Sequence, residues 1–214
     1  MSRVYMYVVD RDFGFAPNPF HGVCTLATCK PPIRKGARVG DWVIGMGGSR
    51  LHATGRCIYA MEVTQTVTFN VYWASREFRN KRPVRNGSRV MMVGDNIYHR
   101  PAGETAWRQL DSHHSLADGS PNPLNVERDT KADRVLISRN FYYFGSKAPD
   151  VPTGMLKRIG FKNARSHRVF DAESCRELMK WIISHREVAN VVHADPFDFE
   201  TSEKRYTGKG SAVA

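Results

Sequence analysis

Short apolar runs separated by turn residues dominate the first third of the chain. Residues 3–9, 41–45 and 55–63 are rich in β-branched, aromatic and small apolar residues and are bounded by Gly or Asp, which predicts three strands. A shorter apolar run at residues 22–28 is expected to form another strand, which a Pro-Pro pair ends. No βαβ rhythm accompanies these runs, so a doubly wound parallel sheet is not expected.

Helical periodicity follows this strand-rich part. Residues 69–80 are expected to form a helix with Thr68 as N-cap, because Phe69, Tyr72 and Trp73 share one face. This face is predicted to pack on the core.

A second helix is expected near the end of the chain, capped by Asp171. Its apolar stripe has the i, i+3, i+4, i+7, i+8 spacing of a core-facing helix and consists of Cys175, Leu178, Met179, Ile182 and Ile183. Between the two helices the sequence predicts a hairpin over residues 89–100 and a strand at residues 134–145.

Strands come first, and helices are inserted between them or appended, which indicates the α+β class. Short strands joined by Gly-bearing turns favour a small, partly open β-barrel. We expect residues 1–200 to form a single domain and residues 201–214 to form a flexible polar tail.

Charge narrows the choice of partners. With 32 Lys and Arg against 21 Asp and Glu, the formal net charge is +11, which favours nucleic acid or a nucleotide as partner. No run reaches the roughly 18 apolar residues of a membrane span, and no basic amphipathic helix stands out, so no membrane partner is expected. The first apolar run is too short for a signal peptide, so the cytoplasm is the expected compartment.

A basic run begins where the first predicted helix ends. Residues 76–89 carry several Lys and Arg but a single acidic residue, Glu77. A solvated surface is the alternative to a phosphate-binding one. The residues expected to bind phosphate are Lys30, Arg76, Arg79, Lys81 and Arg82.

The segment at residues 10–30 is irregular and yet apolar. Gly, Pro and Asn prevent a regular helix or strand, while three Phe argue against a solvated linker. Ordered loops of this kind are often built for recognition or catalysis, and a packed crossover between strands is the alternative. We expect a base-binding pocket lined by Phe13, Phe15, Asn18, Phe20, Trp42 and Tyr143.

Adjacent histidines lie in the polar, turn-rich segment at residues 101–133. His113 and His114, together with Asp10 and Asp12 of the first loop, are the candidate acid–base groups of an enzyme. Two ordinary loop histidines are the alternative.

The cysteines show no ligand spacing for zinc and no disulfide framework. We therefore expect no metal site, and we expect buried free thiols at Cys24, Cys29, Cys57 and Cys175. No P-loop, dinucleotide-binding or hydrolase motif is present, so no cofactor is assigned.

Four segments carry a family resemblance: residues 13–20 (FGFAPNPF), 24–30 (CTLATCK), 40–45 (GDWVIG) and 142–145 (YYFG). Together they resemble the second nucleotide-modification-associated domain family, over the chain to about residue 170. The resemblance implies a role in a bacterial or phage system that modifies or processes nucleic-acid bases, with protein partners from that system and with no reaction assigned.

A second similarity concerns only the fold. Gly40-Asp41 opens one predicted strand and Glu62-Val63 ends the next, an order similar to that of PUA-like barrels, including the EVE and YTH base readers. This similarity implies an aromatic-lined base pocket at one end of a barrel.

Three functions stay open at this point. The first is a module that captures a base or nucleotide, the second is an enzyme acting on one with Asp and His groups, and the third is a scaffold that only holds DNA. If the loop at residues 13–20 and the histidine pair share one pocket with clustered titratable groups, the enzyme is favoured.

Overall fold

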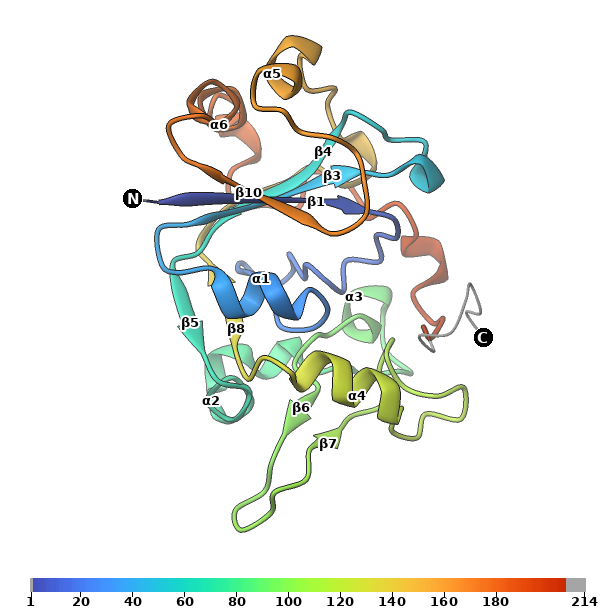
Figure 1. Ribbon diagram of the computed structural model, residues 1–214. Helices are drawn as coiled ribbons and strands as arrows, with labels where there is room; N and C mark the ends of the chain where they lie inside the picture. Colours follow the sequence, from blue (N-terminus) through green and yellow to red (C-terminus); the bar gives the residue numbers. More distant parts are fainter. Residues whose placement is uncertain (1, 207–214) are drawn as a thin grey trace.

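The main sheet of the computed structural model, which describes residues 2–206, has five strands in the order β10-β1-β3-β4-β9 (Figure 1). Their bounds are β1 (Arg3–Val9), β3 (Trp42–Gly47), β4 (Cys57–Glu62), β9 (Asn140–Tyr143) and β10 (His167–Asp171). β1 and β3 are parallel, with Val4 opposite Trp42, and the other three pairs are antiparallel. The predicted strands at residues 3–9, 41–45 and 55–63 are the three at the centre of this sheet.

The parallel pairing of β1 with β3 requires a crossover connection, which the irregular loop provides. The chain leaves β1, forms the loop, adds β2 (Cys24–Leu26) to another sheet and continues into α1 (Pro31–Gly36) before it returns to β3. The crossover thus carries the aromatic loop and the start of α1 to the carboxyl end of β1.

A second sheet has the strand order β2-β8-β5, with β5 (Gln65–Val67) and β8 (Val135–Ser138). β8 and β9 follow each other closely in sequence but belong to different sheets, so the strand predicted at residues 134–145 is divided in two. A third, two-stranded sheet pairs β6 (Tyr98–His99) with β7 (Arg108–Gln109). The α+β class is confirmed, whereas the PUA-like barrel stays unconfirmed because these sheets do not close on themselves.

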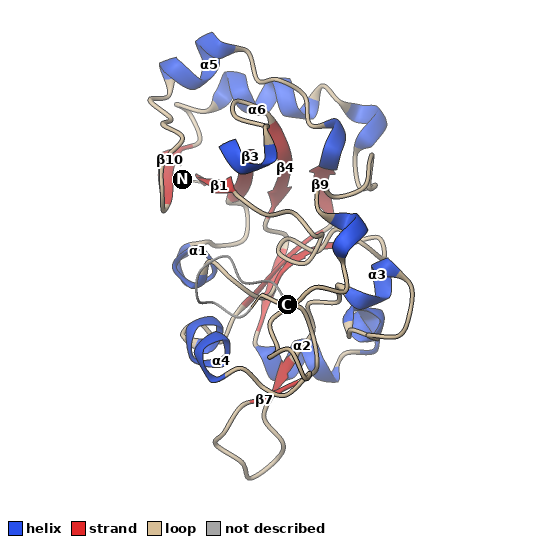
Figure 2. Ribbon diagram, turned by 90° about the vertical axis from the view of Figure 1, so that its right-hand side faces the viewer, coloured by secondary structure: helices blue, strands red, loops and turns tan. Residues whose placement is uncertain are grey.

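Helices cover the main sheet on one face and surround the second sheet. Figures 1 and 2 show α5 (Thr153–Arg158) and α6 (Arg176–Ile183) on one side of the main sheet, and α1 with α4 (Pro123–Thr130) on the other. Two shorter helices, α2 (Phe69–Ala74) and α3 (Arg89–Met92), lie in the lower part with the second sheet. Among the described residues, no helix has the length and apolar character needed to cross a membrane.

Besides the divided strand, three predicted elements have other bounds or another secondary structure than expected. The helix predicted at residues 69–80 has the predicted cap, since Thr68 Oγ1 accepts from Val71 N at 3.3 Å, but it ends at Ala74 and a 3₁₀ segment (Arg76–Lys81) follows. The predicted hairpin at residues 89–100 is wrong, because its first arm is α3 and β6 pairs with β7 instead.

The third difference is the start of the last helix. Asp171 ends β10 and accepts hydrogen bonds from Ser174, so the helix begins only at Arg176. Cys175, Leu178 and Ile182 of the predicted stripe are buried, as expected, while Ile183 is exposed.

Two hydrophobic clusters stabilise the fold. One lies around the main sheet, and the other contains Phe13, Phe15 and Phe20 of the loop with Phe69 and Tyr72 of α2. Each fully buried ring contributes about 1.5–3 kcal/mol, so the loop is ordered by the burial of its own phenylalanines. The expected tail also packs in part, because residues 201–206 are ordered against the loop at residues 111–115, while 207–214 lie outside the described residues.

Candidate functional site

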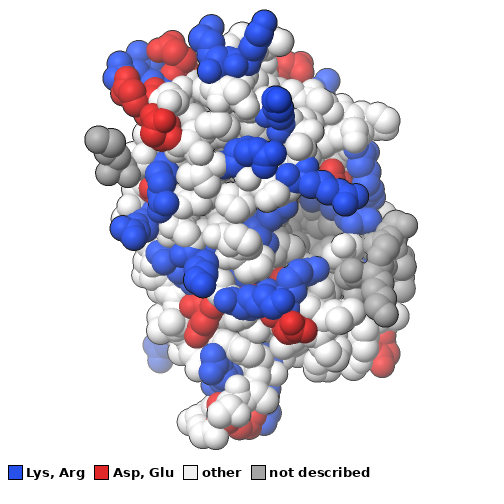
Figure 3. All heavy atoms as spheres, viewed as in Figure 1, with Lys and Arg blue, Asp and Glu red and all other residues white. Residues whose placement is uncertain are grey.

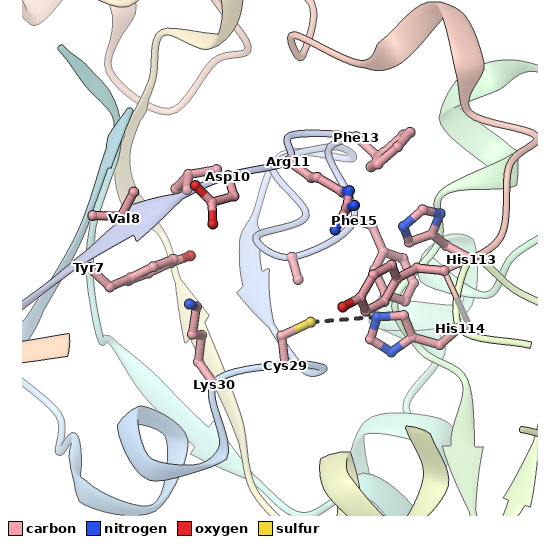
Figure 4. Close-up of a pocket in the computed structure, with 13 residues that line it drawn as sticks. Tyr7, Val8, Asp10, Arg11, Phe13, Phe15, Cys29, Lys30, His113 and His114 are labelled. Carbon is pink, nitrogen blue, oxygen red and sulfur yellow. Dashed lines mark hydrogen bonds between the residues drawn. The ribbon is translucent and has the colours of Figure 1, made fainter. Parts of the chain in front are cut away.

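A pocket of about 230 Å³ opens at the carboxyl end of β1 (Figure 4). Phe13 and Phe15 of the aromatic loop form one wall together with the histidine pair, Tyr7 and Val8 of β1 form the opposite wall, and the residue pair before α1 forms the floor. The lining residues are Tyr7, Val8, Val9, Asp10, Arg11, Phe13, Phe15, Ala16, Cys29, Lys30, His113, His114 and Tyr206. The two loops singled out in the sequence therefore share one pocket, and the Cys29 thiol lies in it beside His114.

Cys29 stands at a sharp turn between β2 and α1. Both Cys29 and Lys30 have left-handed backbone conformations, with φ of 57° and 41°. Non-glycine residues in this region cost about 1–3 kcal/mol, and such strain collects at functional sites. The turn leaves the Cys29 side chain half-buried and open to the pocket, so this thiol differs from the three buried ones expected and found at positions 24, 57 and 175.

The thiol forms a hydrogen-bonded chain with two further side chains. Cys29 Sγ lies 3.5 Å from His114 Nε2, and His114 Nδ1 lies 2.7 Å from Asp129 Oδ2. His114 and Asp129 are both buried. Because Asp129 accepts the proton of Nδ1, the other ring nitrogen is directed at the sulfur, which is the arrangement of a Cys-His-Asp catalytic triad.

Electrostatics within this chain favour a thiolate–imidazolium pair. Burial by itself would raise the pKa of the Cys29 thiol, but the charge and hydrogen bond of His114 outweigh it and lower that pKa. Burial opposes the charged form of His114 as well, yet Asp129 and Cys29 raise its pKa to about 9. For Asp129, the His114 charge overcomes burial and lowers the pKa to about 2. A thiolate is the reactive form of cysteine, so this environment activates Cys29.

The buried guanidinium of Arg34 holds the turn at Cys29 and Lys30 against α4. Its Nε donates to the Cys29 carbonyl oxygen at 2.9 Å, and its Nη1 donates to the carbonyl oxygens of Ala132 and Arg134 at 2.6 and 2.7 Å. Nη2 donates to the carbonyl oxygen of Asp129. One side chain on α1 thereby fixes the backbone of two members of the triad.

His113 has a different role from its neighbour. It is buried against Phe13 and Phe15, with ring centroids 4.3 and 5.2 Å away, and its Nδ1 donates to the Lys204 carbonyl oxygen at 2.7 Å. Burial first, and then the charge of His114, lower its pKa to about 3. His113 is thus a neutral wall of the pocket at neutral pH.

Asp10 and Asp12, the two acidic residues predicted as acid–base groups, also lie in different surroundings. Asp10 lines the pocket, whereas Asp12 is buried behind it and accepts from Tyr143 Oη at 2.6 Å and from the backbone N–H groups of Gly14 and Phe197 at 3.3 Å. Burial raises the pKa of Asp12 to about 6. Tyr143 is fully buried as its partner and does not line the pocket.

Besides Tyr143, three more residues predicted for base binding lie outside the pocket. Phe20 stacks on Phe199 with ring centroids 5.5 Å apart, and Trp42 stacks on Tyr142 at 6.4 Å. The amide of Asn18 is buried, with its Nδ2 donating to the Val93 carbonyl oxygen at 2.8 Å. Of the predicted base-binding set, Phe13 and Phe15 alone line the pocket.

The predicted phosphate-binding set is also divided. Arg76 and Arg79 are exposed, and Arg82 stacks on Trp73 with its Cζ 3.8 Å from the ring centroid. Lys81 does not fit the prediction, because it is buried and its ammonium donates to Asn18 and Val23 at 2.6–2.9 Å. Lys30 lines the Cys29 pocket.

The triad is also the group of described residues whose donor atoms lie close enough to hold a metal ion, within 4.8 Å of one another. However, both Asp129 oxygens accept hydrogen bonds, from Cys29 N and His114 Nδ1 among others. The other two donor atoms, Cys29 Sγ and His114 Nε2, face each other at 3.5 Å and are fewer than the three or four protein ligands of a zinc site. The geometry therefore favours nucleophilic chemistry over metal binding.

Comparison with models of known protein families identifies the family to which the chain belongs. The model of the family described as nucleotide modification associated domain 2 matches residues 1–203. The chain belongs to the nucleotide modification associated domain 2 family. No curated protein and no solved structure matches it.

Membership in the nucleotide modification associated domain 2 family connects the chain with base-modification systems. The match extends past residue 170, where the resemblance of the sequence was expected to end, and includes α6. All three triad residues lie within the matched range.

Sequence reasoning missed two members of the triad. Cys29 was grouped with the buried thiols, although the Lys-Pro-Pro that follows it signals a turn into a helix and so a projecting side chain. Asp129 carries no local signal, because its role depends on the approach of α4 to the histidine loop.

Proposed function

We propose that the protein is an enzyme that uses Cys29 as a nucleophile on a nucleotide or a base-bearing substrate. The observation that carries the proposal is the chain from Cys29 Sγ through His114 to Asp129, placed in an open pocket. Family membership supports a nucleotide as the substrate class.

The geometry fits acyl transfer best. The Cys29 thiolate attacks an acyl carbon and forms a C–S bond, while His114 Nε2 gives its proton to the leaving nitrogen or oxygen as that bond breaks. A water molecule or an amine then attacks the thioester, loses its proton to His114 and releases Cys29. Asp129 stabilises the imidazolium and holds the tautomer throughout both steps.

The test is selective alkylation followed by mass spectrometry of the peptides. At neutral pH iodoacetamide should label Cys29 faster than the other cysteines, because this thiol lines the pocket and its pKa is lowered. Cys24, Cys57 and Cys175 are internal controls, since burial raises their pKa values to about 12, 12 and 11. Labelling of Cys29 no faster than that of the buried cysteines would rule out the activated thiol.

The second step of the test seeks the covalent intermediate. Incubation of the wild type with N-acylated nucleosides and nucleotides, followed by an acid quench that preserves a thioester, should add the mass of the acyl group to Cys29. An acyl adduct that forms equally in the Cys29→Ala variant would contradict the proposed nucleophile.

A binding module that captures a base is the second candidate function. Phe13, Phe15 and Tyr206 offer ring surface in the pocket, and Arg11 lies over the Tyr206 ring at 4.9 Å. Affinity for a nucleoside that is equal in the wild type and in the Cys29→Ala variant, without any covalent adduct, would favour this function.

A further inference from the structure

A second cavity, of about 570 Å³, adjoins the Cys29 pocket. The two cavities share Val8, Asp10 and Lys30 in their walls. Its remaining walls come from the turn after β3 and from the segment before β10, and they are polar, with Ser49, Thr54, Asn163 and Arg165. A substrate larger than the first pocket can therefore extend from Cys29 into this polar cavity.

Two cations, Lys30 and Arg165, line the second cavity. Among residues 2–206, neither Lys30 nor Arg165 forms an ion pair, and the Lys30 ammonium lies 4.4 Å from the centroid of the Tyr7 ring. Burial lowers the pKa of the half-buried Lys30 ammonium although the charges of Cys29 and Asp10 oppose this shift, so an anion bound in the cavity would stabilise the charged form. Figure 3 shows Lys and Arg side chains gathered around a hollow in this face of the molecule.

Asp10 is the acidic residue in the same wall. Figure 4 shows its carboxylate directed into the space near Tyr7 and Lys30. A carboxylate repels a phosphate in direct contact but accepts hydrogen bonds from sugar hydroxyl groups. Asp10 and Lys30 lie in the wall shared by the two cavities and Arg165 lines the second cavity alone, which matches a ligand that has a sugar in its middle and a phosphate at its far end.

We propose that the second cavity is a phosphate subsite, so that the substrate is a nucleoside phosphate. Its reacting group enters the Cys29 pocket, its sugar hydroxyl groups contact Asp10, and its phosphate binds Lys30 and Arg165. This assignment rests on the proposed function for the position of the reacting group, while the phosphate site itself is tested by binding alone.

Protection of Cys29 from iodoacetamide is the first measurement. Each nucleoside 5′-monophosphate is compared with the matching nucleoside, and we expect protection by one or more monophosphates at concentrations where the nucleoside gives none. The Lys30→Gln and Arg165→Gln variants should need about tenfold more ligand for the same relative protection, as expected for the loss of one charge-assisted hydrogen bond. Lys162→Gln is the matched control, because Lys162 is exposed and lines neither cavity.

A terminal phosphate and an internal phosphodiester offer similar chemistry, so a trinucleotide without terminal phosphate is the third ligand. Protection by the trinucleotide that depends on Arg165 assigns the subsite to a nucleic-acid backbone, and protection by the monophosphates alone assigns it to free nucleotides. The phosphate subsite is overturned if the nucleosides protect as well as the monophosphates do, or if both Gln variants leave the protection unchanged.

Calorimetry separates this proposal from the enzymatic one. The Cys29→Ala variant should bind the same monophosphates and lose that affinity on addition of Arg165→Gln. If Cys29 is unreactive but this binding persists, the proposed enzyme is wrong and the phosphate subsite stands. If Cys29 reacts but no phosphate dependence appears in either measurement, the subsite is wrong and the enzyme stands.

Discussion

At the scale of single residues, the two adjacent histidines show how environment decides chemistry. Both are buried, but His114 has a carboxylate and a thiol as partners, whereas His113 faces two phenyl rings and a carbonyl group. The pKa therefore rises to about 9 for His114 and falls to about 3 for His113. One of the pair carries a proton at neutral pH and the other does not.

The first prediction concerns the pH dependence of Cys29 alkylation. The reactive pair requires an ionised thiol and a protonated His114, so the rate should rise as pH passes the lowered pKa of Cys29 and should show a second change near pH 9, where His114 loses its proton. His114→Gln should remove the low-pH reactivity and leave an ordinary thiol profile. The matched control is His113→Gln, which should keep the low-pH limb; an identical profile in all three proteins would contradict the pair.

The second prediction concerns Asp129. Asp129→Asn removes the charge that raises the pKa of His114, so the rate of Cys29 alkylation at pH 6 should fall, and turnover should fall by about a hundredfold or more. A fall in stability without a shift of the pH profile would show that Asp129 has a structural role alone.

The third prediction follows from linkage at His114. Its pKa in the folded protein, about 9, lies above the ordinary value of 6.5, so its stabilising contribution is complete below pH 6.5 and is lost as pH rises through 9. The difference in melting temperature between the wild type and His114→Gln should accordingly shrink between pH 6.5 and pH 9.5. A difference that grows over this range would reverse the assigned sign.

At the scale of elements, the loop between β1 and β3 is ordered by a buried ammonium as well as by its rings. Lys81, from the 3₁₀ segment after α2, donates to the Asn18 side chain and to the carbonyl oxygens of Asn18 and Val23. Burial lowers the pKa of Lys81 to about 8, while the nearby charge of Asp95 opposes the shift. The basic run thus contributes one residue to the interior and leaves its arginines at the surface.

The fourth prediction tests this division of the basic run. Lys81→Met should lower the free energy of unfolding by about 3 kcal/mol, because it leaves Asp95 and three acceptors without the ammonium. Arg79→Met, at an exposed position of the same segment, should change it by less than about 0.5 kcal/mol. Urea denaturation measures both, and equal effects of the two substitutions would contradict the buried role of Lys81.

At the scale of the whole molecule, the pocket is lined by three separate stretches of chain, at residues 7–16, 29–30 and 113–114. A fourth stretch, which ends at Tyr206, closes it. The segment at residues 201–206 contacts the histidine loop, since Tyr206 N donates to the His113 carbonyl oxygen at 2.6 Å and Arg205 donates to both carboxylate oxygens of Asp111 at 2.8 and 3.0 Å. Tyr206 itself lines the pocket. The end of the described chain is therefore part of the site.

The fifth prediction concerns this closing segment. Arg205→Gln should speed hydrogen exchange at residues 111–115 and alter the rate of Cys29 alkylation, with a stability loss of about 1 kcal/mol or less because the pair is partly exposed. Arg56→Gln removes another exposed ion pair, with Asp150, and should leave exchange in the histidine loop unchanged. Unchanged exchange in both variants would show that the segment does not hold the loop.

The sequence by itself determined the features that depend on local pattern. The α+β class, the central strands, the Thr68 cap and the buried stripe of Cys175, Leu178 and Ile182 follow from burial periodicity and capping, which act over a few residues. The aromatic loop and the histidine pair were identified from composition. They share one pocket, which is the arrangement that was expected to favour an enzyme.

Only the tertiary structure decided which of these residues meet. Cys29 and His114 are 85 positions apart and His114 and Asp129 are 15 apart, so no local pattern relates them. The same holds for Lys81, whose acceptors in the loop lie 58 and 63 positions away, and which composition alone grouped with surface arginines. The free energy of burial and the directed hydrogen bonds of the folded chain select the partners, and these partners set the pKa values on which the chemistry depends.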